Sequence, residues 1–480
     1  MTEVVYRCYL AVVAVLAIHG LHRLVLLWAF RRRRPDPAPP ALVTLPFVTV
    51  QLPVYNERDV VCRLIDAVSA LDWPTDRFEI QLLDDSSDDT AQAAAPAIDR
   101  ARARGLHAVA LRRNDREGFK AGALAYGMQR ARGQYIAIFD ADFLPSPGFL
   151  RQTIPHLVGG KSMVQVRWGH LNRDANALTR TQAALLDGHF VVEQPARQSV
   201  GAWFNFNGTA GVWNRSAIEA AGGWQHDTLT EDLDLSYRAL LGGAAFLYLE
   251  GDAVPAEVPD NLPAFLAQQR RWARGSIQTA RKLLPRILRS AHPLRVKAEA
   301  TAHLGANLAW PLCVLVGILL PLVVLTRGSA SLGYVWLDLP IVGFSLLCNA
   351  AFYRAGGARW RDLPQVLALG IGMAPSQAAA TFEGLFAGTG EFVRTPKNGG
   401  GAGSYRVSLS RVPVEPVLSA LNLGVAAWAL TAGHFDTVPF LLLFGLGYGW
   451  VGVEKLRHPQ GDRAPAGALR PDIDEALAGK

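Results

Sequence analysis

Cysteine is scarce in this 480-residue chain, because there are only four, and none of them stands in a paired spacing. This pattern argues against a zinc-binding cluster and against a disulfide framework, and it fits a polar part that faces a reducing cytosol. Charge is also sparse, since charged residues make up 19% of the chain and hydrophobic residues 50%. The mean hydropathy of +0.14 is unusual for a soluble enzyme. The length predicts two or more structural units.

The net charge of +7 is compatible with binding to nucleic acid or to an anionic membrane surface. No motif typical of nucleic-acid binding accompanies this charge. Many of the basic residues lie next to apolar segments: Arg31, Arg32, Arg33, Arg34, Arg270, Arg271, Arg274, Arg281, Lys282, Arg286 and Arg289. We therefore expect a membrane and no nucleic acid among the partners, and the oligomeric state is left open.

Long apolar runs occupy both ends of the chain. Residues 4–30 end in four arginines rather than in a signal-peptide cleavage site, which favours a membrane anchor. The positive-inside rule then places the following part in the cytosol. Four more spans are predicted at 300–326, 332–353, 414–433 and 438–453. The stretch 363–387 contains two prolines, Gln377 and Glu383, which favour a helix in the membrane interface.

These runs divide the chain and predict an integral, multi-pass membrane protein with a cytosolic α/β domain inserted between transmembrane helices. The predicted parts are an N-terminal anchor (1–42), the α/β domain (43–262), interfacial amphipathic helices (263–298), two membrane helices (299–358), an interfacial helix and loop (359–412), two more membrane helices (413–456) and a cytosolic tail (457–480).

Strand-like runs alternate with helical stretches in the polar domain. The runs cover residues 47–54, 78–83, 108–111, 135–139 and 163–166. Their alternation with helices predicts a parallel, doubly wound sheet, in which ligands bind beyond the carboxyl ends of the strands. Two acidic clusters, at 84–85 and 140–142, follow such ends. We therefore expect the active-site cleft at this edge.

Asp140 and Asp142 stand two residues apart after a buried run, so both carboxylates can point to the same side. Such a pair suits Mg²⁺ or Mn²⁺, which would offset the charge on a departing diphosphate. The alternative is a solvated acidic turn. Asp84 and Asp85 fit a contact with a donor nucleotide, whereas Ser87 or Asp88 can cap the helix that follows.

The sequence Thr230-Glu231-Asp232 opens a predicted helix, with Thr230 as its N-cap. Acidic residues in a first turn often serve only to compensate the helix dipole, and this reading stays open for Glu231. The same dipole stabilises the carboxylate form of Asp232, which would keep it available as a base.

Gln268 to Trp272 lie near the start of a basic amphipathic helix. A helix on the membrane surface, with Trp272 as an interfacial anchor, is one interpretation. The other is that Arg271 binds a diphosphate and Trp272 stacks on an acceptor sugar.

In order and spacing, these motifs resemble family 2 glycosyltransferases of the cellulose synthase and hyaluronan synthase type. The likeness is strongest to the cellulose synthase-like A and C groups, which make β-1,4-mannan or glucomannan and β-1,4-glucan backbones. It covers roughly residues 48–276. The segments that carry it are 82–86, 118–123, 164–168 and 206–213.

The resemblance implies a GT-A, Rossmann-like fold, a nucleotide-sugar donor and a Mg²⁺ or Mn²⁺ ion. The segment 392–397 is similar to the gating loop of cellulose synthases, with Thr395 and Lys397 as its candidate residues. The other implied roles are donor binding by Glu57, Asp84, Lys120, Asp140 and Arg271, metal binding by Asp142 and Asp140, catalytic base Asp232, and acceptor contacts by Gln268, Trp272, Asn207, Gly208 and Thr209.

The expected function is therefore inverting transfer of a hexose from GDP-mannose or UDP-glucose to a growing β-linked polysaccharide, with processive extension and translocation. A non-processive enzyme that glycosylates a membrane lipid would use the same catalytic residues. An inactive scaffold or transporter subunit would have lost the acidic motifs, and here each motif is intact.

Overall fold

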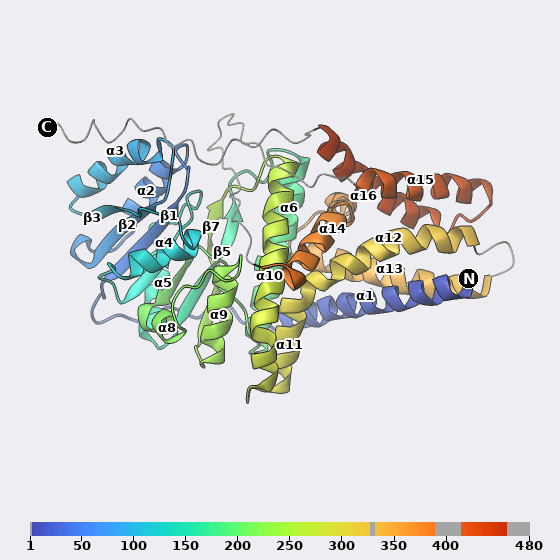
Figure 1. Cartoon of the computed structure of the whole chain (residues 1–480). Helices are drawn as coiled ribbons and strands as arrows, with labels where there is room; N and C mark the ends of the chain where they lie inside the picture. The colour runs from blue at the N-terminus through green and yellow to red at the C-terminus, as the bar shows by residue number, and fades with distance from the viewer. Residues whose placement is uncertain (1, 327–331, 389–413, 458–480) are drawn as a thin grey trace.

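The computed structural model describes residues 2–326, 332–388 and 414–457. An α/β unit forms one end of the molecule, and long helices extend from it to the other end (Figure 1). Helix α1 (Thr2–Arg31) begins at the far tip of these helices. Helix α10 (Leu262–Arg289) stands between the two parts. An α/β domain inserted between long helices was expected from the sequence.

The sheet has seven strands in the order β3-β2-β1-β4-β6-β5-β7. The five strand-like runs of the sequence are all strands. The strands are β1 (Val48–Val54), β2 (Phe78–Asp84), β3 (His107–Arg112), β4 (Tyr135–Ile138), β5 (Met163–His170), β6 (Gly211–Asn214) and β7 (Phe246–Ala256).

The prediction of a fully parallel sheet was wrong, because β6 runs antiparallel to both of its neighbours, β4 and β5. A parallel strand needs a crossover connection, usually a helix. Helices at residues 177–199 also separate β5 from β6, so a helical connection does not by itself make two strands parallel. The chain enters β6 through a loop, residues 200–210, that turns at Gly208 (φ 84°) and Ala210 (φ 53°). Strand β7 runs parallel to β5 and escaped prediction because it contains Gly251 and Pro255, which argue against a strand.

Helices cover both faces of the sheet, so the layered arrangement of a doubly wound fold is present. On one face the core includes α2 (Val61–Ser69), α3 (Thr90–Ala103) and α5 (Phe149–Val158). On the other face it includes α4 (Phe119–Met128), α8 (Arg215–Ala220) and α9 (Glu231–Leu241). Strands buried on both faces read as continuous apolar runs, which explains why the sequence revealed them.

The remaining helices build the junction and the helical part. The stretch expected as an interfacial helix forms α14, which packs against α10, α12 and α16. Its position in a membrane stays a prediction. The helices are α6 (Ala177–Asp187), a π-helical turn (Gly188–Glu193), α7 (Gln194–Ser199), α11 (Leu294–Gly305), α12 (Ala309–Thr326), α13 (Leu332–Ala355), α14 (Leu363–Phe386), α15 (Glu415–Thr431) and α16 (Val438–Arg457).

Within the described ranges, two helical segments are long and apolar enough to cross a membrane, Glu3–Arg31 and Leu294–Thr326. They overlap the first two of the expected spans, and the other spans stay predictions. All four cysteines are free, as the absence of paired spacing predicted.

A buried ion-pair network ties the α/β unit to the long helices. Arg197 on α7 is 2% exposed and lies 2.9 Å from Glu299 on α11 and 3.1 Å from Glu193. Glu299 also lies 2.8 Å from His22 on α1. Because removing one member of a buried pair leaves the other charge uncompensated, this network stabilises the junction.

Replacing Arg197 with methionine should therefore lower the free energy of unfolding by roughly 3–5 kcal/mol, since two partly buried carboxylates, Glu193 and Glu299, lose the cation that they share. Denaturant titration of the purified protein in detergent would measure this change. Arg58→Met, which removes an exposed ion pair with Asp89, is the matched control and should leave unfolding unchanged. Equal stability of the two variants would contradict a stabilising role for the network.

Candidate active site

A cleft opens at the carboxyl ends of β1, β2 and β4 and is closed on its far side by α9 and α10. It encloses about 1080 Å³ of empty space, including space open to solvent. Most of the side chains predicted from the sequence line this one cleft: Glu57, Lys120, Asp140, Asp142, Asn207, Gly208, Asp232, Gln268, Arg271 and Trp272. Acidic motifs far apart in the chain therefore meet where the sheet geometry predicted.

Asp84 does not line the cleft, although it was the nucleoside contact expected from the sequence. It is 3% exposed, and its Oδ1 accepts a hydrogen bond from Ser86 N at 2.9 Å. The next residue, Asp85, lines the cleft instead and lies 2.5 Å from Nη2 of Arg113. Asp84 therefore shapes the turn after β2, and its predicted contact with a nucleoside stays a prediction.

Thr209 also lies beneath the cleft rather than in its wall. It is fully buried, and its Oγ1 accepts a hydrogen bond from Asp140 N at 2.9 Å. This contact fixes the backbone at the start of the acidic motif. The predicted gating residues, Thr395 and Lys397, lie outside the described residues.

Tyr55, Arg116 and Trp168 also line the cleft, and the sequence had given them no role. The Arg116 guanidinium lies 3.3 Å from the centroid of the Tyr55 ring, at the entrance side formed by the loop after β1. Trp168 stacks on Phe190 with centroids 4.5 Å apart, which holds its indole in the wall. Trp168 was part of a family-like segment, whereas Arg116 has no sequence pattern that would single it out.

Lys120 on α4 forms the closest charge pair in the cleft. Its Nζ lies 2.5 Å from Asp140 Oδ1 and donates a hydrogen bond to Gly208 O at 3.0 Å. Burial disfavours the charge, but the nearby carboxylates of Asp140, Glu231 and Asp232 outweigh it and raise the pKa of Lys120. The ammonium group is therefore fully charged where an anionic ligand would enter.

Gly208 allows the loop before β6 to approach the acidic residues. Its φ of +84° favours glycine, and a Cβ at this position would lie 3.0 Å from Asp232 Oδ2 and 3.4 Å from Lys120 Nζ. A side chain here would fill the space between the carboxylate and the ammonium group.

Asp232 lies in the first turn of α9, where its Oδ1 accepts a hydrogen bond from Leu233 N at 2.8 Å. The helix terminus was expected to stabilise its carboxylate form. Burial and the adjacent Glu231 carboxylate outweigh that effect and the attraction of Lys120, and they raise the pKa of Asp232 to about 7. A pKa near neutrality suits a general base.

The N-cap predictions had mixed outcomes. Thr230 occupies the N-cap position of α9 but makes no capping hydrogen bond with its side chain, and its Oγ1 lies 3.3 Å from Thr279 Oγ1 on α10. The prediction of Ser87 or Asp88 as the cap of α3 was wrong, because the N-cap residue is Asp89 and its side chain makes no capping hydrogen bond. Asp88, one residue earlier, accepts a hydrogen bond from Thr90 N at 3.0 Å.

Arg271 enters the cleft from α10, opposite the strand ends. Burial lowers its pKa, while Glu231, Asp140 and Asp232 act in the opposite direction. Arginine keeps its charge even after such a shift. The cleft therefore has cationic groups on two sides, Lys120 and Arg271, with carboxylates between them.

The carboxylates of Asp140 and Asp142 fit a divalent cation that is shared with a ligand. No group of three or more potential metal-binding side chains is found in the parts of the chain that the structure describes. Mg²⁺ commonly uses one or two protein carboxylates and completes its shell with substrate phosphates and water. Asp142 is 2% exposed and is held by Glu257 N, which donates to its Oδ2 at 3.2 Å.

Family models and known proteins match most of this chain. The profile of Glycosyl transferase family 2 matches residues 49–217, and that of Glycosyl transferase family group 2 matches residues 135–353. The chain is 36% identical to glucomannan 4-beta-mannosyltransferase 2 of Arabidopsis thaliana over 451 residues, which cover 85% of this chain and 81% of the relative. It is 45% identical to glucomannan 4-beta-mannosyltransferase 1 of Oryza sativa subsp. japonica over 271 residues, or 54% of this chain and 52% of the relative.

A solved structure shares the fold. The mannosyltransferase PcManGT from Pyrobaculum calidifontis, solved in complex with GDP-Man and Mn²⁺, aligns with a TM-score of 0.55. The sequences are 20% identical, and the alignment covers 79% of this chain and 99% of that chain. The likeness supports a GT-A-like α/β fold with a mixed sheet.

If Asp232 is the proton acceptor, turnover should fall by about tenfold per pH unit below pH 7, because the carboxylate becomes protonated. Glu231→Gln removes a charge that raises the pKa of Asp232, so this decline should move to lower pH. Glu219→Gln, an exposed change on α8, is the control and should leave the profile in place. An unmoved profile in Glu231→Gln would contradict the assignment, as would full turnover in Asp232→Asn.

Proposed function

This chain belongs to glycosyltransferase family 2, and on that premise we propose that it extends a β-1,4-linked mannan backbone from a nucleotide-activated mannose. Mannose is favoured because both relatives described above are named glucomannan 4-beta-mannosyltransferases. GDP-mannose is the donor we would test first, and UDP-glucose is the alternative. The extended polysaccharide is the acceptor.

The observation that carries this proposal is that cationic groups and carboxylates line the same cleft. Lys120 and Arg271 provide positive charge for a diphosphate, and Asp232 provides a carboxylate with a pKa of about 7. In an inverting transfer, Asp232 accepts the proton of the acceptor hydroxyl as its oxygen attacks the anomeric carbon. The diphosphate departs on the opposite side of that carbon, and the positive charges of Lys120 and Arg271 offset its negative charge.

Asp142 and Asp140 would hold the divalent cation, and Lys120 already lies against Asp140. Bound there, Mg²⁺ or Mn²⁺ would offset the negative charge of the departing diphosphate. Trp272 and Trp168 line the same cleft with aromatic faces, which suits the apolar face of a sugar ring. Gln268, Asn207 and Gly208 complete the side that would receive the acceptor.

Membrane embedding is the second part of the proposal. Two helical segments have the length and apolar character of membrane spans. The first ends at Arg31 and is followed directly by three more arginines. We expect a multi-pass protein with a cytosolic catalytic domain, in which the growing glycan leaves through the helices. Arg274 and Gln278 both donate hydrogen bonds to Gly388 O, so α10 contacts the last described residue before the predicted gating segment 392–397. Its role in processive transfer stays a prediction.

A donor screen on the purified protein tests this function. With GDP-mannose and Mn²⁺ or Mg²⁺, radiolabel should enter a product that is retained on size exclusion and cut by an endo-β-1,4-mannanase. Asp142→Asn should reduce incorporation by at least about 100-fold, because the cation loses a carboxylate. A single-sugar lipid product would contradict processive synthesis, and absence of transfer from any nucleotide sugar would contradict the function itself.

A further inference from the structure

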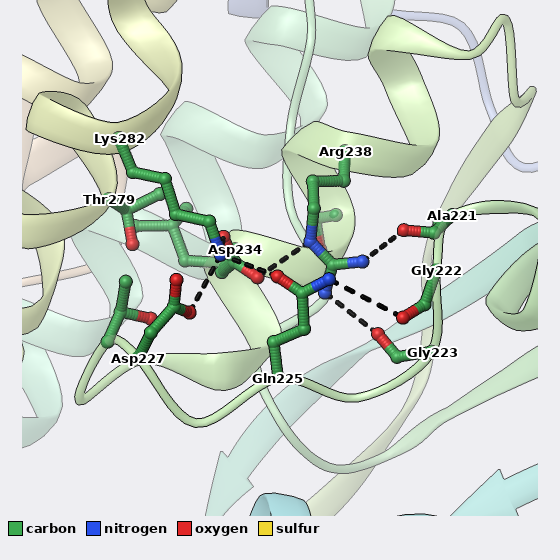
Figure 2. Close-up of polar contacts among 12 residues, drawn as sticks. Ala221, Gly222, Gly223, Gln225, Asp227, Asp234, Arg238, Thr279 and Lys282 are labelled. Atoms are coloured by element: carbon green, nitrogen blue, oxygen red, sulfur yellow. Dashed lines mark hydrogen bonds and ion pairs between the residues drawn. The ribbon is translucent and has the colours of Figure 1, made fainter.

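The segment that carries Asp232 is held against the C-terminal half of α10 by an ion-pair cluster (Figure 2). The Nζ of Lys282, on α10, lies 2.7 Å from Asp227 Oδ1 and 2.8 Å from Asp234 Oδ1, and it donates a hydrogen bond to Gln225 Oε1 at 2.7 Å. One ammonium group therefore joins α10 to the loop before the catalytic helix and to the helix itself.

Asp234 is the buried centre of this cluster. It is fully buried, and its second oxygen, Oδ2, lies 2.7 Å from Arg238 Nε. Arg238 also donates hydrogen bonds to Ala221 O and, at 2.9 Å, to Gly223 O (Figure 2). Lys282 belongs to α10, and Arg238, which lies on α9 itself, is bonded to the 221–223 segment, so the cluster fixes the direction of α9 from two sides.

Two more contacts connect α10 to the residues just before Asp232. Gln278 Oε1 accepts a hydrogen bond from Leu229 N at 2.9 Å, and Thr279 pairs with Thr230 through their hydroxyl groups. The helices also meet closely at Gly275, where a Cβ would lie 2.6 Å from Thr230 Cγ2 and 2.9 Å from Thr230 N. The catalytic segment is thus held by α10 at several successive turns.

The contacting positions form one stripe with the cleft residues of the same helix. Gln268 and Arg271 line the cleft, and Gly275, Gln278 and Lys282 continue along α10 at spacings of three and four residues. Residues at such spacings share one face of a helix. A single helix face therefore presents cleft residues at one end and contacts the segment that carries Asp232 at the other.

We infer that Lys282 is a positioning residue, which sets the Asp232 carboxylate relative to Arg271 and Trp272 by tying α9 to α10. This role rests on the proposed function, in which Asp232 is the base. Lys282 does not reach the cleft, and Asp234 keeps Arg238 as a partner when Lys282 is removed. Loss of Lys282 should therefore displace the catalytic segment more than it unfolds the protein, and a displacement of about 1 Å can lower a rate by about 100-fold.

The test compares Lys282→Met with Lys282→Arg in the full-length protein, using GDP-mannose as donor. Lys282→Met should lower kcat by roughly 10- to 100-fold, while the KM for donor and the binding of GDP with Mn²⁺ stay close to wild type. Its pH profile should lose the decline below pH 7, because a displaced Asp232 no longer controls the rate. Lys282→Arg keeps the charge and should recover most of kcat.

Two further variants complete the design. Asp227 is an exposed partner of Lys282, so Asp227→Asn should weaken the same cluster. This change should lower kcat several-fold without a change in thermal unfolding. Arg286→Met removes a positive charge from an exposed position one turn further along α10 and should behave as wild type.

A kcat of Lys282→Met equal to wild type would overturn the inference, and so would parallel losses of kcat, GDP binding and thermal stability. The proposed function would survive either result, provided that the wild type transfers mannose and Asp232→Asn does not. If the wild type transfers no sugar, the proposed function fails instead.

Discussion

Repulsion among carboxylates is the constraint on which this site depends. Asp140, Asp142, Glu231 and Asp232 converge in one cleft from two different parts of the chain. Like charges in a partly buried space raise one another's pKa and disfavour a compact arrangement. In the protein alone, Lys120 and Arg271 offset part of this charge, and burial together with the adjacent Glu231 carboxylate raises the pKa of Asp232 to about 7. A cleft with this balance is suited to a ligand that brings a divalent cation together with a diphosphate.

The scaffold holds these charges in place from two directions. The strand ends of the sheet fix Asp140 and Asp142, because β4 lies in the middle of the sheet and is fully buried. Helix α10 forms the opposite wall of the cleft. It also contacts the long helices, since Arg270 and Arg274 both pair with Glu383 on α14. The same helix thus contacts the catalytic segment on one side and the long helices on the other. Helix α10 therefore connects the cleft directly to the helical part of the molecule.

Much of this organisation could be predicted from the sequence, because it rests on local patterns. Strands buried on both faces are continuous apolar runs, and an acidic pair that follows such a run marks the edge where ligands bind. The antiparallel strand β6 could not be predicted, since it has only four residues and depends on a turn at Gly208 and Ala210. Which of Asp84 and Asp85 lines the cleft could not be predicted either. Adjacent residues at a strand end point to opposite faces of the sheet, and the sequence does not show which of the two faces the cleft.

The remaining differences between the sequence-based predictions and the structure come from tertiary contacts. The pKa of Asp232 depends on its burial and on how close Glu231 and Lys120 come to it, which local helix rules do not contain. Arg116 and Lys282 carry no motif, and their partners lie far away in the sequence or on another element. Electrostatic coupling and packing between distant segments are thus the parts of the site that only the folded structure reveals.

The most direct measurement is calorimetric titration of GDP into the purified protein with and without Mn²⁺. If the carboxylate cleft takes a cation together with a diphosphate, GDP should bind only when Mn²⁺ is present. Binding should be lost in Asp142→Asn and retained in Asp232→Asn, because only the first of these changes removes a predicted metal ligand. GDP binding that is equally tight in EDTA, or unaffected by Asp142→Asn, would contradict the account.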